Sequence, residues 1–482
     1  MAYCIWKSYK LKIEPLLIFS ALKNEKNCFF LDSSLNSDYS QGRFSFLGID
    51  PFFILKTKGQ NPFGKLREAL NKYNFSPPQK FPIPFLGGAV GYFTYDLGVT
   101  LEKKIKKIAK EDLGIPDCFL GFYNTVVVID HLKKLLYIFA LGFPETKYHL
   151  AKSLAGANFK KVYNLISNIP NVKKPLLNAD ICKSNADKRR CYNWSNLRPS
   201  ALHLRESAFK DTQLNSNFTK ENYLLAIKKA KEYIKAGDIY QVNLSQSFKT
   251  RTGLTGFEIY RRLRQISPSY FSAYFDAGDF QILSSSPERF LKLEGNIVIS
   301  RPMKGTRPRA KDKIKDRKLR QELLESVKDK AELVMIVDLE RNDLGRVCSY
   351  DSVKVTKLRE LEEYSTVFQT TATVQGHLHK DKDRIDLLRA CFPGGSITGC
   401  PKIRAMEIIE ELEPSRRSIY TGCLGYLSFC GNMDFNILIR TILKKENQLY
   451  FGVGGGIVTD SRPEDEYEET LVKAKAMIEA IK

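Results

Sequence analysis

This chain of 482 residues has few histidines, no closely paired cysteines and no long hydrophobic run. No apolar stretch approaches the roughly 20 residues that a helix needs to cross a bilayer. The start lacks a basic segment followed by an apolar one, so we expect a cytoplasmic protein with no membrane segment. The ten cysteines include no Cys-x-x-Cys pair, and with only five histidines they indicate reduced thiols and no zinc site.

The formal net charge of +22 allows two interpretations. Nucleic-acid binding requires Lys and Arg clustered along the path of the phosphates. Here the lysines are spread through amphipathic segments, and no aromatic-basic RNA signature occurs, so we expect no nucleic-acid partner. Attraction of a small polyanionic substrate, or a lysine-rich proteome, accounts for the charge equally well.

Two further enzyme classes lack the residues that they need. The glycine-rich loop over 392–402 has no Gly-Lys-Ser/Thr and is not a nucleotide P-loop, although free N–H groups at the start of the following helix would hold another anion. The stretch 422–425 is similar to the cysteine elbow of glutamine amidotransferases, but no histidine follows it to act as a base. We expect Cys423 to be a buried strand residue.

Composition and periodicity divide the chain into three segments. Residues 1–169 alternate apolar stretches with turns and predict a β-rich part, including a hairpin over 125–139. Residues 170–217 are polar and aperiodic, which indicates a linker or an insertion. Residues 218–482 carry the glycine-rich loops and the charged motifs that predict chemistry.

Two predicted helices each carry a pair of carboxylates. One helix covers 316–334, with an apolar face through Val327 and Val334, and the other begins near Pro463. Their acids are spaced three residues apart and share a face in each helix: Asp329 with Glu332, and Glu466 with Glu469. A hard cation such as Mg²⁺ would accept these oxygens, whereas the alternative is a solvated helix face.

The segment Arg301–Arg309 surrounds a single lysine with other cations. Lys304 stands directly before a glycine, so a turn there could present its amine as a nucleophile beside anion-binding groups. The alternative is a basic surface loop. Glu288, between a proline and an arginine, is either an ion-paired surface group or a placed acid. Gln241 is predicted to lie on the polar face of a strand over 240–245.

Taken in order, these stretches resemble the chorismate-utilising enzyme family over nearly the whole chain, except for residues 170–217. The matching segments are 31–33, 42–48, 237–244, 286–290, 302–309, 336–343, 394–402 and 466–470. The resemblance implies one α/β (α+β) unit, in which large antiparallel sheets pack face to face with helices outside and the active site lies between them.

Within that family, Lys304 is typical of the branch that forms 4-amino-4-deoxychorismate, whereas anthranilate synthases have a small residue there. Gln241 stands where isochorismate-forming members have a lysine thought to activate water; a neutral amide cannot be a base, and ammonia needs none. The resemblance implies a synthase that takes chorismate and ammonia from a separate glutamine amidotransferase subunit, for 4-aminobenzoate and folate synthesis. Anthranilate synthase component I is the alternative, and a basic nucleic-acid-binding protein is a distant one.

The resemblance also implies the roles of individual residues. Lys304 would attack C2 of chorismate while Glu288 protonates the departing C4 hydroxyl. Glu332 and Glu469 would bind Mg²⁺ directly, with Asp329 and Glu466 holding its waters. The substrate would be bound by Gly305, Thr306, Thr398, Tyr420, Arg440, Gly454, Gly455 and Lys473.

Relatives carry a tryptophan-binding pocket, which here would include Ser33, Arg43, Tyr270 and Phe271. Tyr270 replaces the proline that is usual in the family. Gln369 replaces a histidine of the anthranilate synthases; an amide can form hydrogen bonds but cannot shuttle a proton, which counts against loss of pyruvate.

Overall fold

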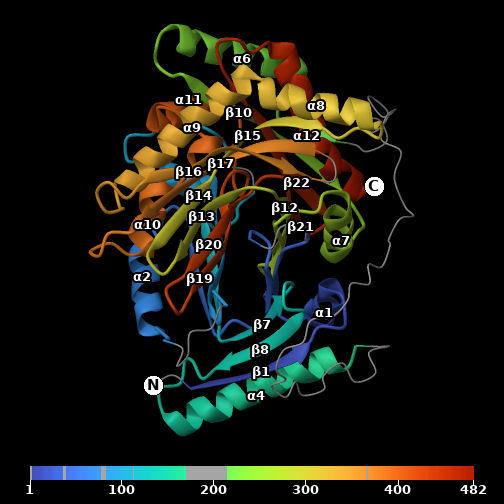
Figure 1. The fold of residues 1–482 in the computed structure, drawn as a ribbon, viewed down its shortest axis with the longest axis vertical. Helices are drawn as coiled ribbons and strands as arrows, with labels where there is room; N and C mark the ends of the chain where they lie inside the picture. The colour runs from blue at the N-terminus through green and yellow to red at the C-terminus, as the bar shows by residue number, and fades with distance from the viewer. Residues whose placement is uncertain (1–2, 36–39, 77–82, 112, 170–213, 365–366) are drawn as a thin grey trace.

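In the computed structural model, residues 3–35, 40–76, 83–111, 113–169, 214–364 and 367–482 are described. They form two large sheets with helices on the outside (Figure 1), and every strand pairing in them is antiparallel apart from one isolated bridge outside the strands. This arrangement confirms the predicted fold class.

The first sheet has 12 strands within these residues. In spatial order they are β1 (Cys4–Lys10), β8 (Leu135–Leu141), β7 (Thr125–Asp130), β3 (Phe44–Gly48), β2 (Phe29–Asp32), β11 (Phe271–Asp276), β12 (Phe280–Ser286), β21 (Thr441–Lys445), β22 (Gln448–Ile457), β10 (Gln241–Arg251) and β18 (Gly399–Cys400), with β9 (Asn215–Ser216) beside β10.

The second sheet has 10 strands within the same residues. Their order is β15 (Met303–Pro308), β17 (Val367–His377), β14 (Ile297–Arg301), β13 (Arg289–Glu294), β20 (Met433–Ile437), β19 (Cys423–Ser428), β5 (Gly88–Phe93), β6 (Cys118–Tyr123) and β4 (Phe53–Thr57), with β16 (Lys354–Glu363) also paired to β17.

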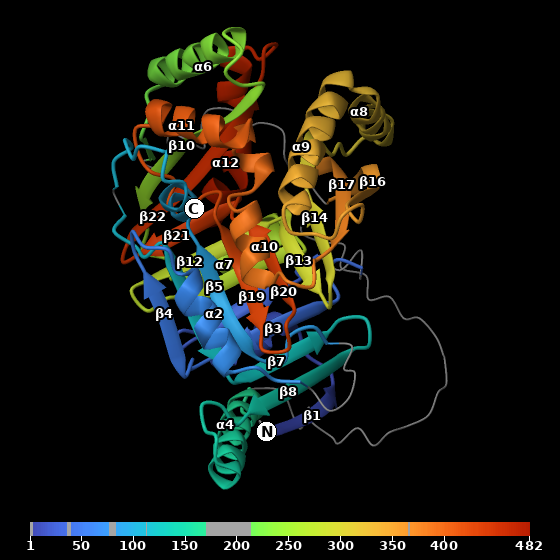
Figure 2. The same cartoon turned by 90° about the vertical axis from the view of Figure 1, so that its left-hand side faces the viewer.

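The helices cover the outer faces of the sheets. Their bounds are α1 (Pro15–Leu22), α2 (Phe63–Lys72), α3 (Tyr95–Leu101), α4 (Tyr148–Ser167), α6 (Lys220–Lys235), α7 (Gly256–Ile266), α8 (Lys313–Glu325), α9 (Val327–Gly345), α10 (Arg384–Cys391), α11 (Lys402–Leu412) and α12 (Pro463–Ile481), with a short 3-10 turn at Gly395–Ile397. Figure 2 shows α6, α11 and α12 on one side of the upper half and α8 and α9 on the other.

Both sheets combine strands from the two ends of the chain. In the first, β2 pairs with β11, so that Leu31 lies opposite Ala273. In the second, β5 pairs with β19, and Gly91 lies opposite Gly425. Gly91 is also close to the backbone of its other neighbour, β6, since a Cβ on Gly91 would lie only 1.9 Å from the carbonyl oxygen of Phe119. The early and late parts of the chain therefore form one structure.

Several local predictions are confirmed. The expected hairpin is β7 and β8, and Cys423 is fully buried in β19. Helix α12 begins at Pro463 as predicted. The predicted linker over 170–217 falls mainly on residues 170–213, which lie outside the described residues, whereas Asn215–Ser216 pair with β10. Within the described part of the chain, no helix is both long and apolar enough to cross a membrane.

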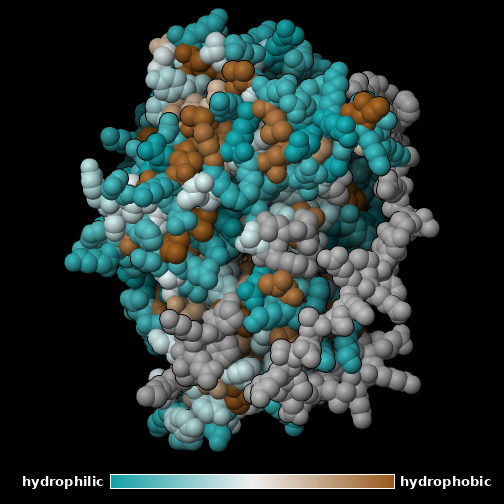
Figure 3. All heavy atoms as spheres, in the orientation of Figure 1, coloured by the Kyte–Doolittle hydropathy of each residue, from teal (hydrophilic) through white to brown (hydrophobic). Residues whose placement is uncertain are grey.

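The predicted single helix over 316–334 is wrong, because the chain forms two helices that meet at Ser326. This residue has extended backbone, and its hydroxyl accepts a hydrogen bond from the N–H of Asp329 at 3.2 Å, which starts a new helix. The break changes the helical register, so Val327 and Val334 are 81% and 37% exposed. Figure 3 shows hydrophobic side chains at the surface in the region of α8 and α9.

Candidate active site

Lys304 lies on β15, at the edge of the second sheet. The pairing of β15 with β17 shifts register between Lys304 and Thr306, and Gly305 there has a φ of +76°. A Cβ on Gly305 would lie 2.8 Å from Leu323 and 3.0 Å from Cγ of Asp329. The bulge therefore needs glycine directly after Lys304, which itself stays paired with Thr370.

The amine of Lys304 and the amide of Gln241 both lie beside Gly456, which is on β22. A Cβ on Gly456 would be 3.0 Å from Nε2 of Gln241 and 3.2 Å from Nζ of Lys304. Gln241 belongs to the first sheet and Lys304 to the second, so the two sheets meet at this point. Both amide atoms of Gln241 are buried and have no hydrogen-bond partner within the described residues, which is typical of a group that awaits a ligand.

The environment of Lys304 favours a neutral amine. Burial lowers its pKa, and the positive charge of Lys473 acts in the same direction. Glu332 and Glu288 oppose the shift, but the net pKa is lowered. A lysine of this kind is partly unprotonated at a lower pH than a solvated one and can act as a nucleophile.

Glu288 is a buried acid, only 4% exposed, in the loop that joins β12 to β13. Burial raises the pKa of its carboxyl to about 7. A hydrogen bond from the Ser396 side chain, the charge of Lys304 and the N–H of Met303 partly offset this rise. Glu288 therefore retains a proton near neutrality, as a general acid must.

Acidic side chains from α9 and α12 face one another beside this pair. Burial raises the pKa of Glu332 and that of Glu466. Nζ of Lys328 lies 3.9 Å from an oxygen of each, so one ammonium bridges the two helices. Carboxylate oxygens are the donors that a hard cation prefers, and the ammonium of Lys328 shows that a positive charge is accommodated between the two helices. Nevertheless, the residues described by the structure contain no group of three acidic, histidine or cysteine side chains close enough to hold a metal.

The other predicted metal residues have partners within the protein. Asp329 pairs with Arg307 at 3.0 Å. Glu469 pairs with Lys473 at 2.6 Å; burial acts to raise the pKa of Glu469, but the charge and hydrogen bond of Lys473 outweigh it and the net pKa is lowered. Lys473 also donates to the carbonyl of Gly454 at 2.9 Å. A Cβ on Gly455 would lie 3.2 Å from Oε2 of Glu466, so this glycine leaves room beside the acids.

Arg440 offers a guanidinium to an anion. Burial lowers its pKa, it donates to Oγ of Ser267 at 3.4 Å, and no carboxylate pairs with it within the described ranges. The predicted residue Tyr420 packs its ring against Gly452. A half-buried arginine without a counter-charge suits bidentate binding of a substrate carboxylate.

The two predicted threonines occupy different surroundings. Thr306 is exposed and accepts a hydrogen bond from Nε2 of Gln369 at 3.2 Å. Thr398 is buried, and its hydroxyl donates to the carbonyl of Gly394 at 2.9 Å. Thr398 therefore fixes the glycine-rich loop from within.

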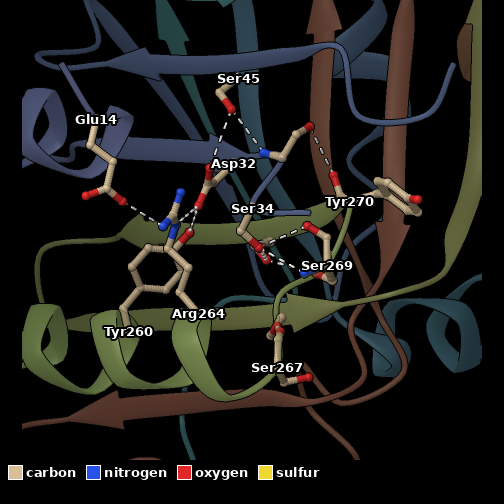
Figure 4. A network of polar contacts seen from close by, with 12 residues as sticks. Glu14, Asp32, Ser34, Ser45, Tyr260, Arg264, Ser267, Ser269 and Tyr270 are labelled. Carbon is tan, nitrogen blue, oxygen red and sulfur yellow. Dashed lines mark hydrogen bonds and ion pairs between the residues drawn. The ribbon is translucent and has the colours of Figure 1, made fainter. Parts of the chain in front are cut away.

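Two of the predicted effector residues, Ser33 and Tyr270, belong to a buried polar network around Asp32 (Figure 4). The hydroxyl of Ser33 lies 2.9 Å from the carbonyl of Phe44 and 3.2 Å from that of Tyr270. Next to it, the buried Asp32 pairs with Arg264 at 2.5 Å.

The other two effector residues have partners elsewhere. Arg43 pairs with Asp130 at 2.8 Å, and the ring of Phe271 lies beneath Arg289. Tryptophan binding stays a prediction.

Glu340 is among the buried acids that the sequence patterns did not predict. Glu340, on α9, is 3% exposed and lies among the core residues of that helix. The signal was present, because Leu333, Val337, Glu340 and Leu344 recur at the spacing of one helical face.

The site therefore contains a buried lysine with a lowered pKa, a buried carboxyl with a raised one, and a half-buried arginine with no carboxylate partner among the described residues. Residues 27–479 match the family described as chorismate binding enzyme. The chain is 37% identical over 484 residues to anthranilate synthase component 1 of Acetivibrio thermocellus, covering 97% of this chain and 92% of the relative. It is also 37% identical over 454 residues to aminodeoxychorismate synthase component 1 of Salmonella typhimurium, covering 90% and 89%.

The solved structure of anthranilate synthase component I from Streptococcus pneumoniae has the same fold, with a TM-score of 0.73, 30% identity and 97% of both chains covered. The protein belongs to the chorismate binding enzyme family, as a chorismate-utilising enzyme of the anthranilate synthase and aminodeoxychorismate synthase type.

Proposed function

We propose that the protein converts chorismate and ammonia to 4-amino-4-deoxychorismate, the precursor of 4-aminobenzoate in folate synthesis, through a covalent bond to Lys304. The observation that carries this proposal is that Lys304 and Gln241 both lie beside Gly456, with the buried Glu288 near enough to act on the pKa of the lysine. An amine with a lowered pKa and an acid with a raised one are the two groups that an exchange of a hydroxyl for an amine requires.

In the first step, Nζ of Lys304 forms a bond to C2 of chorismate and the bond from C4 to its hydroxyl breaks. Glu288 gives its proton to the departing oxygen, which leaves as water, and the lysine nitrogen releases a proton that restores Glu288. In the second step, ammonia bonds to C4 and the bond from C2 to Lys304 breaks. A proton from the ammonia nitrogen returns to the lysine, so that chorismate and ammonia give the product and one water.

The amide of Gln241 is neutral, so it orients a nucleophile without deprotonating it. Water needs a base before it can attack, whereas ammonia does not. A site with Gln241 at this position therefore favours amination over hydration.

We further propose Mg²⁺ as the cofactor, with Glu332 and Glu469 as its ligands and Asp329 and Glu466 holding its waters. Bound Mg²⁺ would supply positive charge for the ring carboxylate of chorismate. Lys473 and the backbone of Gly454 would contact the same carboxylate, and Arg440 with Tyr420 would bind the enolpyruvyl carboxylate.

The ammonia would come from a separate glutamine amidotransferase subunit, because Cys423 is buried in a strand and no histidine follows it to complete an amidotransferase site. Free ammonium at high pH should replace that subunit. A preparation that is inactive with chorismate, Mg²⁺ and ammonium would contradict the proposal.

The test is intact mass spectrometry of the protein with chorismate and Mg²⁺ in the absence of ammonia. We expect an adduct of one chorismate minus one water on the native protein, and none on Lys304→Ala. Lys311→Ala is the matched control, since Lys311 lies two residues after the segment Arg301–Arg309 and is exposed. If Lys304→Ala keeps the full rate with ammonium, the covalent mechanism is wrong.

A second candidate is anthranilate synthase component I. The relative of that name from Acetivibrio thermocellus is 37% identical to this chain, the same identity as the aminodeoxychorismate synthase component 1 of Salmonella typhimurium. This reaction would release anthranilate and pyruvate without a second enzyme. Product analysis separates the two functions directly. Gln369, which cannot carry a proton, favours the product that retains its enolpyruvyl group.

A further inference from the structure

Glu340 is a carboxyl in the interior of the protein, close to the predicted catalytic acid but outside the set described above. Its neighbours on the inner face of α9 are Leu333, Val337 and Leu344, all buried. A carboxylate at such a position is costly unless it is protonated or fully hydrogen bonded.

The hydrogen bonds around Ser300 indicate which form is present. Oγ of Ser300 lies 3.0 Å from the carbonyl oxygen of Phe290 and 2.9 Å from Oε2 of Glu340. A serine hydroxyl has one proton, so Ser300 must share it between these two acceptors. Oε2 of Glu340 therefore receives at most a shared hydrogen bond, which stabilises a buried carboxylate poorly and favours the protonated form.

The other oxygen of Glu340 connects it to the catalytic acid through a short loop. Oε1 accepts a hydrogen bond from the N–H of Gly395 at 3.2 Å. The next residue in the chain, Ser396, has its side chain hydrogen bonded to Glu288. The two buried carboxyls therefore share the loop Gly394–Ser396.

Other titratable groups surround Glu340. Asp343 lies one turn further along α9, contacts Lys402 and pairs with Arg346 at 2.9 Å, so two cations offset its charge. Lys402 also donates to the carbonyls of Cys391 and Pro393, at 3.0 Å and 2.8 Å, and so fixes the start of the loop.

Burial is the main cause that raises the pKa of Glu340 to about 7, and the negative charges of Asp343 and, to a smaller extent, Glu288 raise it as well. The charge of Lys402 and the hydrogen bond from Ser300 act to lower this pKa. The buried thiol of Cys391 is neutral, because burial raises its pKa well above the usual value.

We propose that Glu340 is a positioning residue for Glu288, and that the two carboxyls titrate as a coupled pair in which the charge of one keeps the proton on the other. When Glu340 loses its proton, its negative charge disfavours a second negative charge on Glu288. Glu288 then keeps its proton to a higher pH than it would alone.

This coupling matters for the chemistry of the site, and in this respect it rests on the proposed function. The amination needs Glu288 protonated at the same pH at which Lys304 and ammonia are unprotonated. A neighbour that delays the ionisation of Glu288 widens the pH range in which all three conditions hold.

The experiment is infrared titration of protonated carboxyl groups in the ligand-free protein, comparing the native chain with Glu340→Gln and Glu288→Gln. An amide at position 340 can donate to Ser300 and accept from Gly395, so the variant keeps both hydrogen bonds but cannot ionise. We expect Glu340→Gln to remove one carboxyl band at neutral pH and to lower the titration midpoint of Glu288 by about 0.3 to 1 pH unit.

By reciprocity, Glu288→Gln should lower the midpoint of Glu340 by the same amount, and this arm remains informative if Glu340→Gln does not fold. Asp96→Asn is the matched control. Asp96 has a pKa that burial raises to about 7, but the charges that act on it come from Asp117, Glu410 and Arg416. This variant should remove a band and leave the midpoint of Glu288 unchanged.

An unchanged midpoint of Glu288 in Glu340→Gln, or a neutral-pH spectrum that loses no band in that variant, overturns the proposal. An equal shift of the Glu288 midpoint in Asp96→Asn also overturns it, because the effect would then be nonspecific. The titration uses no substrate, so it can succeed even if the adduct experiment on Lys304 shows that the proposed function is wrong.

Discussion

Replacing Gly456 by alanine should impair the chemistry and spare the fold. The new Cβ would lie 3.0 Å from Nε2 of Gln241 and 3.2 Å from Nζ of Lys304, and ordinary contacts start at 3.4 Å. The two side-chain tips must therefore move by at least 0.4 Å and 0.2 Å, the differences between these distances. Both are flexible ends, so we expect unfolding free energy to change by no more than about 0.5 kcal/mol.

The reaction should be more sensitive than the fold to this displacement. A misplacement of about 1 Å can cost on the order of 100-fold in rate, so a shift of a few tenths of an ångström should slow amination by about 3- to 10-fold. The assay is the rate of product formation from chorismate with saturating ammonium and Mg²⁺, together with a urea unfolding curve for each variant.

Two glycines serve as controls for Gly456→Ala. Gly64→Ala lies on α2 with nothing within 4 Å of the new Cβ, so it should leave the rate unchanged. Gly91→Ala would place the Cβ 1.9 Å from Phe119 and should destabilise the protein severely. If Gly456→Ala retains the full rate, Lys304 and Gln241 do not meet over this glycine in the reacting enzyme.

Three other predictions concern stability, pH and metal. Glu413 lies 2.7 Å from the buried Arg417 and is its counter-charge. Glu413→Gln removes that charge and should lower the free energy of unfolding, measured in urea, by about 3 to 5 kcal/mol. A loss below about 1 kcal/mol would be inconsistent with a buried ion pair. The pKa of Glu288 is raised from 4.5 to about 7, so its stabilising contribution is complete below pH 4.5 and disappears as pH rises through about 7. Relative to Glu288→Gln, the native protein should lose about 3 kcal/mol across that window, and parallel urea midpoints would refute this shift. Glu332→Gln should weaken Mg²⁺ binding at least 10-fold by calorimetry, whereas equal affinity would remove Glu332 from the ligand set.

The sequence predicted individual elements better than their pairing. The hairpin at 125–139 and the start of α12 at Pro463 follow from local periodicity and the first-turn preference of proline. The neighbours of β2 and β5 could not be predicted in this way, because their partners β11 and β19 lie far along the chain. Ser326 was read as part of a continuous apolar period, although a serine three residues before an aspartate is a start signal for a helix.

The same limit applies to the candidate site. The motifs pointed to Lys304 and Glu288 as chemical groups, but periodicity could not show that Gln241 would approach Lys304 from the opposite sheet. That meeting depends on how the sheets pack at Gly456. Glu340 shares the helical spacing of the buried Leu333, Val337 and Leu344, which indicates an inward-facing acid, but this spacing does not show that Ser300 and Gly395 surround it.

The sharing of both sheets between the two ends of the chain has a consequence for biosynthesis. When β5 leaves the ribosome, its hydrogen-bonding edge must wait for β19, and β2 must wait for β11. Unpaired strand edges promote aggregation, and pairings so distant in sequence form slowly. The second sheet cannot be completed until the ribosome has passed residue 437, and the first not until it has passed residue 457. The nascent chain therefore needs protection through most of its synthesis, and two separately expressed halves should become soluble only when they are produced together.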